Sequence, residues 1–221
     1  MPLITHWTSK DLDALPQIEG VRYEIIDGDL YVSTPPCWTS KDLCRFPADL
    51  GLRYEIIDGE LYVSTAPSLD HQYTCRRLTA HLDAWCLTTA LGEVFPEPGL
   101  IFAPDRDVLP DVVWISHQRL QGAEDQAGHL TRAPELVIEV LSPGPTNAYR
   151  DREVKLALYS RQEVEEYWIV DPVAQTVNVY RPVEGALVQV EVLGTEDTLT
   201  SVLLLPGFSC PVSMLFRQVE G

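Results

Sequence analysis

The most prominent hydrophobic and polar pattern in the chain occurs twice. The segment RYEIIDGDLYVSTPP at residues 22–36 returns as RYEIIDGELYVSTAP at residues 53–67. Each copy has β-forming residues on both sides of Asp-Gly, a pair that tolerates the positive φ angles of a two-residue hairpin turn. The pattern therefore predicts two β-hairpins, Arg22–Ser33 and Arg53–Ser64.

The repeat begins upstream of the hairpins. WTSKDL stands at residues 7–12 and again at residues 38–43, in register with the hairpin repeat. A period near 30 residues can indicate a solenoid, but a solenoid needs about three or more units to bury a continuous core. Nothing after residue 67 continues the pattern, so we interpret the repeat as a tandem duplication.

The two copies differ in their downstream sequence. The second runs directly into SLDHQYTCRRLTAHLDAWC, which has helical periodicity, so we expect it to belong to the core sheet. The first is expected to be appended, which gives a segment at residues 1–37 and a main domain at residues 38–221. The first copy is either a remnant of duplication that lies on a sheet edge or is loosely held, or an extra hairpin that covers an edge or exchanges between subunits.

The rest of the chain alternates between helical and strand patterns. Ser68 is a suitable N-cap, and apolar residues then recur at helical spacing, which predicts a helix over Leu69–Thr89. A further helix is expected at 147–162 and a short one at 213–217. Short β-rich runs occur at residues 92–103, 110–116, 134–142, 165–171, 176–181 and 186–193. These elements predict an α/β fold with a central mixed sheet flanked by helices.

Composition narrows the choice of partners. The chain has 221 residues, 45% of them hydrophobic, which suits one main domain. Its formal net charge is −17, which opposes non-specific binding to nucleic acid or to an anionic membrane, so a polyanion could bind only at a local basic patch or through metal ions. No stretch approaches the ~20 apolar residues of a membrane span and no leader pattern is present, so a cytoplasmic protein is expected.

The cysteines do not suggest a metal or disulfide framework. The chain has five of them, with no C-x-x-C pair. An odd, scattered set is typical of reduced thiols. They are Cys37, Cys44, Cys75, Cys86 and Cys210.

Three acids in apolar strand patterns are the candidates for chemistry. Glu55, Asp111 and Glu139 would each need pairing, protonation or a metal to offset desolvation. Asp111 and Glu139 on neighbouring strands could hold one hard cation such as Mg²⁺. The alternatives are that Asp111 is a turn former at the start of a strand, and that Glu139 pairs with a buried Arg or Lys.

The helix after Glu139 supplies cations. Asp151, Lys155 and Tyr159 are spaced four apart and share one helical face. Lys155 could reach over the sheet to the attacking water or the scissile phosphate, or it could simply form a stabilising pair with Asp151. The same stretch is locally basic, with Arg150, Arg152 and Arg161 as candidate nucleic-acid contacts.

Five collinear motifs carry a resemblance to a known family. They are RYEIIDGELYVSTAPSLDH, PDVVWIS, ELVIEVLSPGPT, DREVKLALY and VEEYWIVDP. In order and spacing they resemble the Uma-type restriction endonucleases, which are placed in the PD-(D/E)xK nuclease superfamily. The resemblance covers about residues 52–181. It implies a restriction-endonuclease-like fold with a divalent-metal-dependent phosphodiesterase site.

The resemblance assigns expected roles to individual residues. The Pro-Asp element corresponds to Asp111 and the second acid to Glu139, with the Val140 carbonyl as a third metal ligand. Glu55 would be a supporting acid near the metal. His71 falls where the family usually has a histidine, although a histidine near a helix start is often a capping or packing residue.

The lysine position departs from the superfamily pattern. That lysine should stand two residues after the second acid, where this chain has Leu141. In this family it moves to the following helix, which corresponds to Lys155. Tyr159 would position Lys155 or a phosphate oxygen.

These residues predict an endonuclease that uses Mg²⁺ or Mn²⁺ to hydrolyse DNA phosphodiester bonds. Cleavage of both strands needs two sites, so a homodimer is expected. The acidic charge predicts weak or conditional DNA binding. The alternative is a catalytically inactive, dimeric binding or regulatory module on the same fold. An enzyme that acts on RNA or another phosphodiester would share the same site.

Overall fold

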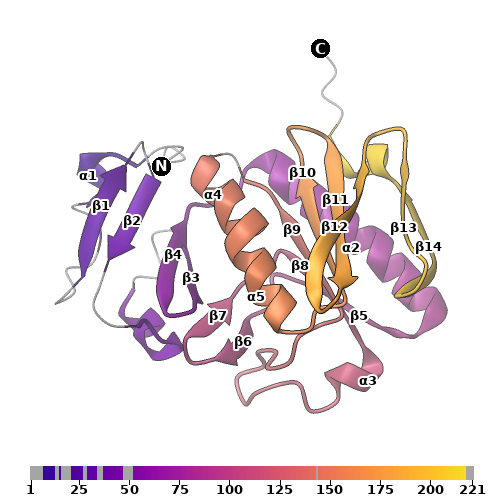
Figure 1. Cartoon of the computed structure of the whole chain (residues 1–221), viewed down its shortest axis with the longest axis horizontal. Helices are drawn as coiled ribbons and strands as arrows, with labels where there is room; N and C mark the ends of the chain where they lie inside the picture. The colour runs from indigo at the N-terminus through magenta and orange to yellow at the C-terminus, as the bar shows by residue number, and fades with distance from the viewer. Residues whose placement is uncertain are drawn as a thin grey trace. The chain divides into compact units, whose positions relative to one another are not determined.

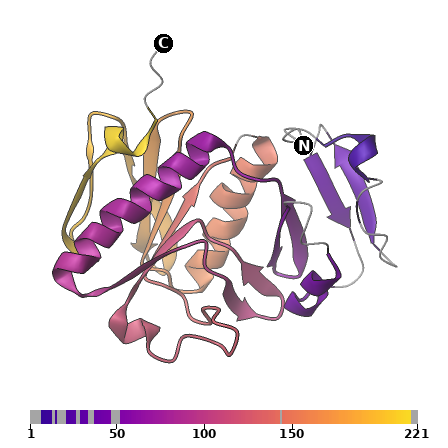
Figure 2. The ribbon, with the colours of Figure 1, turned by 180° about the vertical axis from the view of Figure 1, so that it is seen from behind.

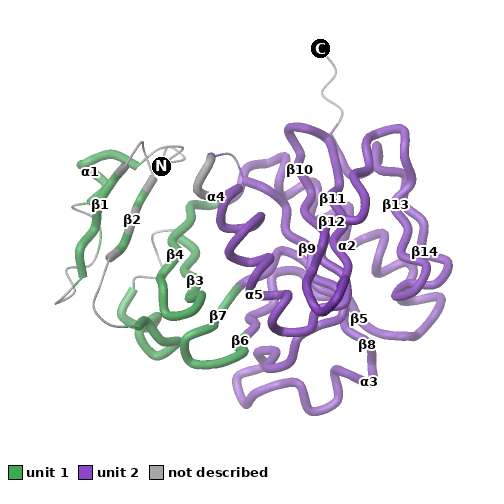
Figure 3. The backbone as a smooth tube through the Cα atoms, in the orientation of Figure 1, with its two compact units in different colours: residues 1–66, 101–108 green, residues 67–100, 109–221 purple. Residues whose placement is uncertain are grey.

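The chain forms two compact units in a computed structural model (Figure 3). The structure describes residues 7–12, 15, 21–26, 29–33, 37–46, 52–142 and 144–217. Unit 1 comprises residues 1–66 with 101–108, and unit 2 comprises residues 67–100 with 109–221. The predicted division into an appended segment at 1–37 and a main domain at 38–221 stays a prediction.

The second hairpin of unit 1 has the predicted form. β3 (Arg53–Ile57) pairs antiparallel with β4 (Glu60–Ser64). The connecting Asp58 and Gly59 have φ angles of 52° and 81°, as a two-residue turn with both central residues left-handed requires. This hairpin belongs to a four-stranded sheet of order β4-β3-β7-β6, with β6 at Leu100–Ala103 and β7 at Arg106–Val108.

The first hairpin repeats the pairing as a separate two-stranded sheet. β1 (Arg22–Ile26) pairs antiparallel with β2 (Asp29–Ser33). Its turn at residues 27–28 lies outside the described residues. The WTSKDL segments upstream each start a short helix: α1 (Ser9–Leu12) and the 3₁₀ helix η1 (Ser40–Arg45).

Unit 1 has its own small core. Trp38 and Phe46 lie with ring centroids 5.4 Å apart, and Phe46 stacks on Tyr54 at 4.7 Å. Ile56 and Leu61 of the second hairpin complete the buried part of this cluster. The partly buried residues that pack against it are Val21, Val32, Leu43, Tyr54 and Val63. Val21 and Val32 come from the first copy, so both copies contribute to one cluster.

Unit 2 is built on a six-stranded mixed sheet of order β12-β11-β10-β9-β8-β5 (Figure 1). β9 and β10 are parallel, and the other neighbours are antiparallel. In chain order the strands are β5 (Gly92–Pro96), β8 (Val112–Ser116), β9 (Leu136–Val140), β10 (Glu166–Asp171), β11 (Thr176–Val183) and β12 (Ala186–Leu193). The predicted mixed sheet is confirmed.

Helices cover both faces of this sheet. α2 (Leu69–Thr89) crosses one face, as the view from behind shows (Figure 2). The connection from β9 to β10 lies on the other face and comprises α4 (Pro145–Tyr149), a π-helical turn η3 (Arg150–Val154) and α5 (Lys155–Arg161). A parallel strand pair needs such a crossover.

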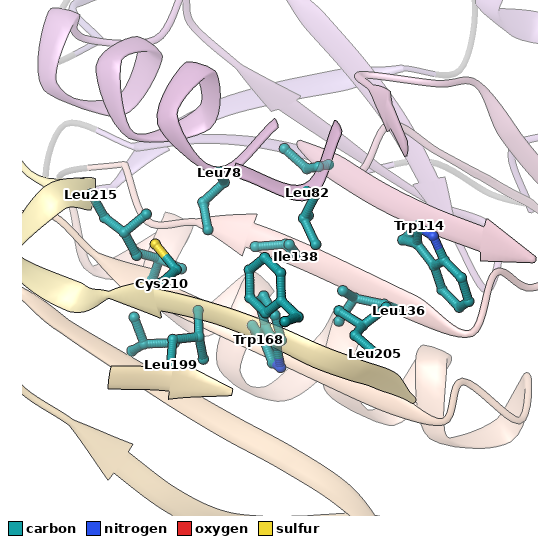
Figure 4. Close-up of a cluster of buried hydrophobic side chains, with 14 of the residues drawn as sticks. Leu78, Leu82, Trp114, Leu136, Ile138, Trp168, Leu199, Leu205, Cys210 and Leu215 are labelled. Atoms are coloured by element: carbon teal, nitrogen blue, oxygen red, sulfur yellow. The ribbon is translucent and has the colours of Figure 1, made fainter. Parts of the chain in front are cut away.

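The α2 face holds the main hydrophobic core (Figure 4). Leu78 and Leu82 of α2 face Ile138 of β9 and Trp168 of β10, all of them at most 1% exposed. α2 begins where the Ser68 side chain accepts a hydrogen bond from the His71 N–H at 3.2 Å, and it ends at the left-handed Ala90. The sequence predicted both bounds of this helix.

Some elements differ from the sequence prediction. The run at 92–103 is two strands in different sheets, β5 and β6, because the chain turns between them at Glu97, which has a φ of 50°. The hairpin β13 (Thr198–Ser201) and β14 (Leu205–Pro211) was not predicted. The expected helix at 213–217 is instead the 3₁₀ helix η4 (Val212–Leu215), and a short α3 (His117–Leu120) follows β8.

A helix that crosses a membrane must be long and predominantly apolar. Among the described residues, no helix has the length and apolar character needed to cross a membrane.

Candidate active site

Asp111 and Glu139 belong to neighbouring segments of unit 2, with Asp111 directly before β8 and Glu139 within β9. β8 and β9 are antiparallel, with Val112 opposite Ile138 and Val113 opposite Val137. The same register continued by one residue places Asp111 opposite Glu139. Both carboxylates are buried, 4% and 2% exposed. The Asp111 side chain meets His71 of α2, whereas Glu139 meets Lys155 and Tyr159 of α5.

Asp111 is held as an ionised carboxylate. Its Oδ2 accepts a hydrogen bond from the Val140 backbone N–H at 2.8 Å, and His71 Nε2 lies 3.1 Å from the same oxygen. Burial by itself raises the pKa of this group, but the hydrogen bond and electrostatic attraction of His71 act against burial. With the positive charge of Lys155 and the Val140 N–H, they lower the pKa of Asp111 to about 2.

Glu139 is bonded from the helix that covers its face of the sheet. Lys155 Nζ donates to Glu139 Oε1 at 3.0 Å, and the Tyr159 hydroxyl donates to the same oxygen at 2.9 Å. Lys155 is 1% exposed and Tyr159 is fully buried. A buried ammonium group is stable only when it is paired and hydrogen-bonded, and Glu139 meets that requirement.

The π-helical turn directs a second acid toward Lys155. Asp151 is 1% exposed, and its Oδ1 lies 3.9 Å from Lys155 Nζ. Arg150 Nε donates to the same Oδ1 at 2.9 Å, and the Tyr167 hydroxyl donates to the Asp151 carbonyl at 2.8 Å. Lys155 is therefore flanked by two carboxylates, one from the sheet and one from its own helix.

Asp151 was foreseen only as a helical partner of Lys155, and its burial was missed. An acid four residues before a lysine is common on exposed helices, so spacing alone carried no signal of burial. π-helical turns are rare and often occur at functional sites. The same turn holds the backbone N–H of Lys155 to the Arg150 carbonyl.

His71 and Cys75 lie on the other side of Asp111. They occupy the first two turns of α2, four residues apart, and are 2% and 7% exposed. Cys75 Sγ lies 3.5 Å from His71 Nδ1, while Nε2 faces Asp111. The sequence predicted His71 either as a site residue or as a capping or packing residue, and Cys75 was not predicted. The only available signal for Cys75 was its four-residue spacing from His71.

The predicted nucleic-acid contacts have different surroundings. The Arg150 side chain is 11% exposed and bonded to Asp151. Arg152 is 40% exposed and lies 3.4 Å from Asp171 Oδ2, and Arg161 is exposed at the end of α5. Arg152 and Arg161 therefore have surface available to a ligand, whereas most of Arg150 is covered. Their role in DNA binding stays a prediction.

Glu55 belongs to the other compact unit. It is 4% exposed on β3 and lies opposite Tyr62 of β4. Its expected role as a supporting acid for the metal stays a prediction.

The donor set at the strand pair suits a hard divalent cation. Asp111 and Glu139 offer carboxylate oxygens, and the Val140 N–H donates to the Asp111 carboxylate, which holds the backbone of β9 next to it. Two ionised carboxylates on neighbouring segments repel each other, and nearby positive charge relieves this repulsion. Oxygen ligands in small number, completed by water, are what Mg²⁺ and Mn²⁺ accept.

Comparison with known proteins identifies the relatives of this chain. A family profile described as "Putative restriction endonuclease", named Uma2, matches residues 39–213. A solved structure described as a putative nuclease belonging to DUF820, from Anabaena variabilis, is similar with a TM-score of 0.64 and 19% sequence identity. The match covers 80% of this chain and 97% of that one, which confirms the predicted restriction-endonuclease-like fold. No curated protein matches the chain.

Proposed function

Because the chain belongs to the Uma2 family of restriction-endonuclease relatives, we propose that it is a divalent-metal-dependent endonuclease that hydrolyses DNA phosphodiester bonds. One observation carries this proposal. Asp111, directly before β8, and Glu139, in the neighbouring β9, are both buried carboxylates, and a buried lysine amine lies 3.0 Å from Glu139 Oε1.

Asp111 and Glu139 would hold the cation, with the carbonyl of Val140 as a third protein ligand. When bound, Mg²⁺ or Mn²⁺ supplies a Lewis acid that lowers the pKa of water and offsets negative charge at the phosphate. His71 supports this arrangement because it holds Asp111 ionised and in a defined orientation.

Lys155 would orient the attacking water or offset charge on the phosphate. It is carried by a buried helix segment, so its amine has little freedom to move away from Glu139. Tyr159 donates to the same carboxylate oxygen and so limits the orientations that Glu139 can adopt. Asp151 is a positioning residue, because its Oδ1 lies 3.9 Å from the Lys155 amine.

DNA is the proposed substrate, and its binding should be weak or dependent on metal. A protein that neutralises several phosphates draws affinity from Lys and Arg. This chain has a formal net charge of −17, and the crossover segment that carries Lys155 also carries the partly exposed Arg152 and the exposed Arg161. We expect affinity to fall steeply as salt rises. Hydrolysis of RNA would use the same residues, so RNA is the alternative substrate and can be tested in the same assay.

We propose a homodimer, in which two sites would face opposite DNA strands. β12 is the edge strand of the six-stranded sheet among the described residues. Its Val188, Val190 and Val192 occupy alternate positions and are 45%, 42% and 54% exposed. An apolar edge strand of this kind can pair with a second copy of itself. Sedimentation of the wild type and of Val190→Lys would test this, with a shift to monomer expected for the variant.

A cytoplasmic location is also proposed. All five cysteines are free thiols in the structure. Reduced thiols are typical of the cytosol rather than of oxidising compartments.

The proposed function is tested with supercoiled plasmid DNA and Mn²⁺. Glu139→Gln removes a metal-binding charge while keeping the side-chain shape, and we expect at least about a 100-fold loss of nicking rate, since even groups that only support metal ligands contribute about 10–100-fold. Lys155→Met should cause a comparable loss while preserving packing. Calorimetry should show that Mn²⁺ binds the wild type and not Glu139→Gln.

Glu166→Gln is the matched control. Glu166 is another buried strand acid, 3% exposed, but it bonds Trp168 and Ser201 on the α2 face of the sheet. This variant should keep both nicking and Mn²⁺ binding. Equal nicking by wild type, Glu139→Gln and Lys155→Met would identify a contaminating nuclease and overturn the proposal.

A non-catalytic module on the same fold is the second candidate function. The observation that favours it is the Lys155 amine itself, because its bond to Glu139 neutralises the carboxylate without any metal. In that case Mn²⁺ would bind neither the wild type nor Glu139→Gln, and the folded wild type would not nick the plasmid.

A further inference from the structure

We propose that His71, Cys75 and Asp111 form a second metal site that takes a thiophilic transition-metal cation such as Zn²⁺, and that this site competes with the nuclease site for Asp111. The first part rests on the geometry of three buried side chains. The second part rests on the proposed function.

The three side chains supply one ligand atom each within a small volume. The imidazole, thiol and carboxylate ligand atoms all lie within 4.8 Å of one another, and all three residues are buried. His71 and Cys75 have the four-residue spacing that puts two ligands on one face of a helix. Asp111 reaches the same point from the start of β8.

The two short contacts at His71 have ligand separations close to those of a tetrahedral zinc site, but they run to different ring nitrogens, of which one Zn²⁺ binds only one. Zn–S and Zn–N bonds of about 2.3 Å and 2.0–2.1 Å at a tetrahedral angle place sulfur and nitrogen about 3.5 Å apart. Cys75 Sγ lies 3.5 Å from His71 Nδ1. Nitrogen and carboxylate oxygen ligands should lie about 3.4 Å apart by the same reasoning, and His71 Nε2 lies 3.1 Å from Asp111 Oδ2.

Metal binding would replace a hydrogen-bonded chain. At present Nδ1 faces the thiol and Nε2 faces the carboxylate, so binding requires the imidazole ring to rotate until one nitrogen faces both neighbours. The thiol then loses its proton to solvent, because the thiolate is the ligand. Three protein ligands leave a fourth position for water.

The donor atoms distinguish this site from the proposed nuclease site. Thiolate and imidazole ligands favour Zn²⁺ and related transition metals, whereas carboxylate and carbonyl oxygens favour Mg²⁺ and Mn²⁺. Asp111 is the member common to both. A cation bound to His71 and Cys75 draws Asp111 away from Glu139, so Zn²⁺ should inhibit cleavage that depends on Mn²⁺.

Co²⁺ is the spectroscopic probe for the site. A Co²⁺-thiolate bond gives a charge-transfer band in the near ultraviolet, which reads cysteine coordination directly. The full chain should carry Cys37→Ser and Cys44→Ser, because those two thiols are exposed and would bind metal themselves. We expect a band that saturates at one Co²⁺ per chain. The band should be absent when the chain also carries Cys75→Ser.

Cys86→Ser is the matched control. Cys86 lies on the same helix with the same 7% exposure, and its replacement should leave the band in place. A folded parent chain with no band, or a band that survives Cys75→Ser, overturns the proposal. If Cys75→Ser does not fold, peptide mass spectrometry of the parent chain decides: Zn²⁺ should slow alkylation of Cys75 and leave Cys86 unaffected, and equal rates for Cys75 with and without Zn²⁺ overturn the site.

Inhibition separates this site from the nuclease proposal. The Zn²⁺ concentration for half-inhibition of nicking should rise at least about 100-fold in Cys75→Ser, because a direct ligand contributes more than the about 10–100-fold of a supporting group. Each variant is compared with its own rate without Zn²⁺. A Co²⁺ band in a chain that does not nick DNA would refute the nuclease function and support the metal site. Nicking without a Co²⁺ band would support the nuclease function and refute the metal site.

Discussion

The two copies of the RYEIID hairpin form the same pairing in different surroundings. Glu24 lies opposite Tyr31 in the first copy, and Glu55 lies opposite Tyr62 in the second. The register is identical, so it follows from the local sequence that both copies share. Side-chain alternation and the Asp-Gly turn are local features, and they act the same way wherever the segment stands.

Burial differs between the copies because their neighbours differ. β3 of the second copy pairs on its other side with β7, and Glu55 is 4% exposed. β1 belongs to a two-stranded sheet, where the Glu24 side chain is 43% exposed and forms a 3.0 Å ion pair with Arg22. One sequence thus produces a buried acid and a surface acid.

The segments upstream of the hairpins also share local hydrogen bonds and differ in burial. The Asp11 carboxylate accepts hydrogen bonds from the Thr8 side chain and N–H at 2.6 and 2.7 Å, and Asp42 accepts the equivalent bonds from Thr39 at 2.8 and 3.0 Å. These bonds lower the pKa of both carboxyl groups. The tryptophan that begins each segment differs in burial: Trp38 is 5% exposed in the core of unit 1, whereas Trp7 is only partly buried. Local hydrogen bonds repeat with the sequence, and packing does not.

The largest expected difference between the copies is in stability. Ile56 is fully buried in the unit 1 core, and its counterpart Ile25 is only partly buried. Ile56→Ala should lower the free energy of unfolding by about 2–5 kcal/mol, because it leaves a cavity. Ile25→Ala should cost clearly less. Urea unfolding of both variants measures the difference, and equal losses would mean that the copies are equivalent.

The next difference is in activity, and it rests on the proposed nuclease function. Glu55→Gln should slow Mn²⁺-dependent nicking by about 10–100-fold if Glu55 supports the metal ligands. Glu24→Gln is its exact positional counterpart and should leave the rate unchanged. Both are assayed on plasmid DNA after circular dichroism verifies folding. A wild-type rate for Glu55→Gln would remove Glu55 from the site.

Two single-copy chains test whether sequence or position decides which hairpin is buried. Deletion of residues 1–31 keeps the second copy, and deletion of residues 32–62 joins the first copy to the same downstream chain. Both should fold, because either hairpin can then occupy the buried place. The second chain has Leu15 where the first has Phe46 and so loses a 4.7 Å stack on tyrosine.

The expected cost of that loss is about 1 kcal/mol, the usual contribution of an aromatic pair. Thermal unfolding of the two single-copy chains gives the comparison. Collapse of the chain that lacks residues 1–31 would show that the first copy is the one the fold requires.

The smallest expected difference between the copies is in thiol reactivity, which is measured on the unmodified chain. Cys44 belongs to the second copy and Cys37 directly precedes it. Both are exposed, and the equivalent positions 31 residues earlier are Asp13 and His6, so the first copy has no corresponding thiol. Both should react rapidly with a thiol reagent at neutral pH. Cys210 is fully buried, and burial raises the pKa of its thiol to about 11, so it should react only on unfolding or at strongly alkaline pH. More than two rapid thiols would contradict the assigned burial.

Much of unit 2 could be predicted because its patterns are long or strongly apolar. α2 spans the predicted Leu69–Thr89, since its N-cap and its periodicity are both local. β9 reads as a continuous apolar run because both faces of the central sheet are covered. The hairpin at Thr198–Pro211 was missed, because short strands with polar residues are distinguished from loops only by their packing against the core.

The candidate site could be predicted in part. An acid inside an apolar strand is unusual, which identified Glu139, and the Pro-Asp start of the neighbouring strand identified Asp111. Cys75 and Asp151 could not be identified as buried site neighbours, because four-residue spacings on helices are common and most are exposed. Their burial depends on α2 and α5 packing against opposite faces of one sheet.

By itself, the sequence determined that one hairpin register occurs twice, where the long helix begins and ends, and which acids lie in apolar strands. These features depend on residues a few positions apart, so the shared letters produce the same result in both copies. The tertiary structure alone decided that Glu55 is buried and Glu24 is not, and that Lys155 lies against Glu139. Burial is set by neighbours that are distant in the chain, and no local pattern encodes their position.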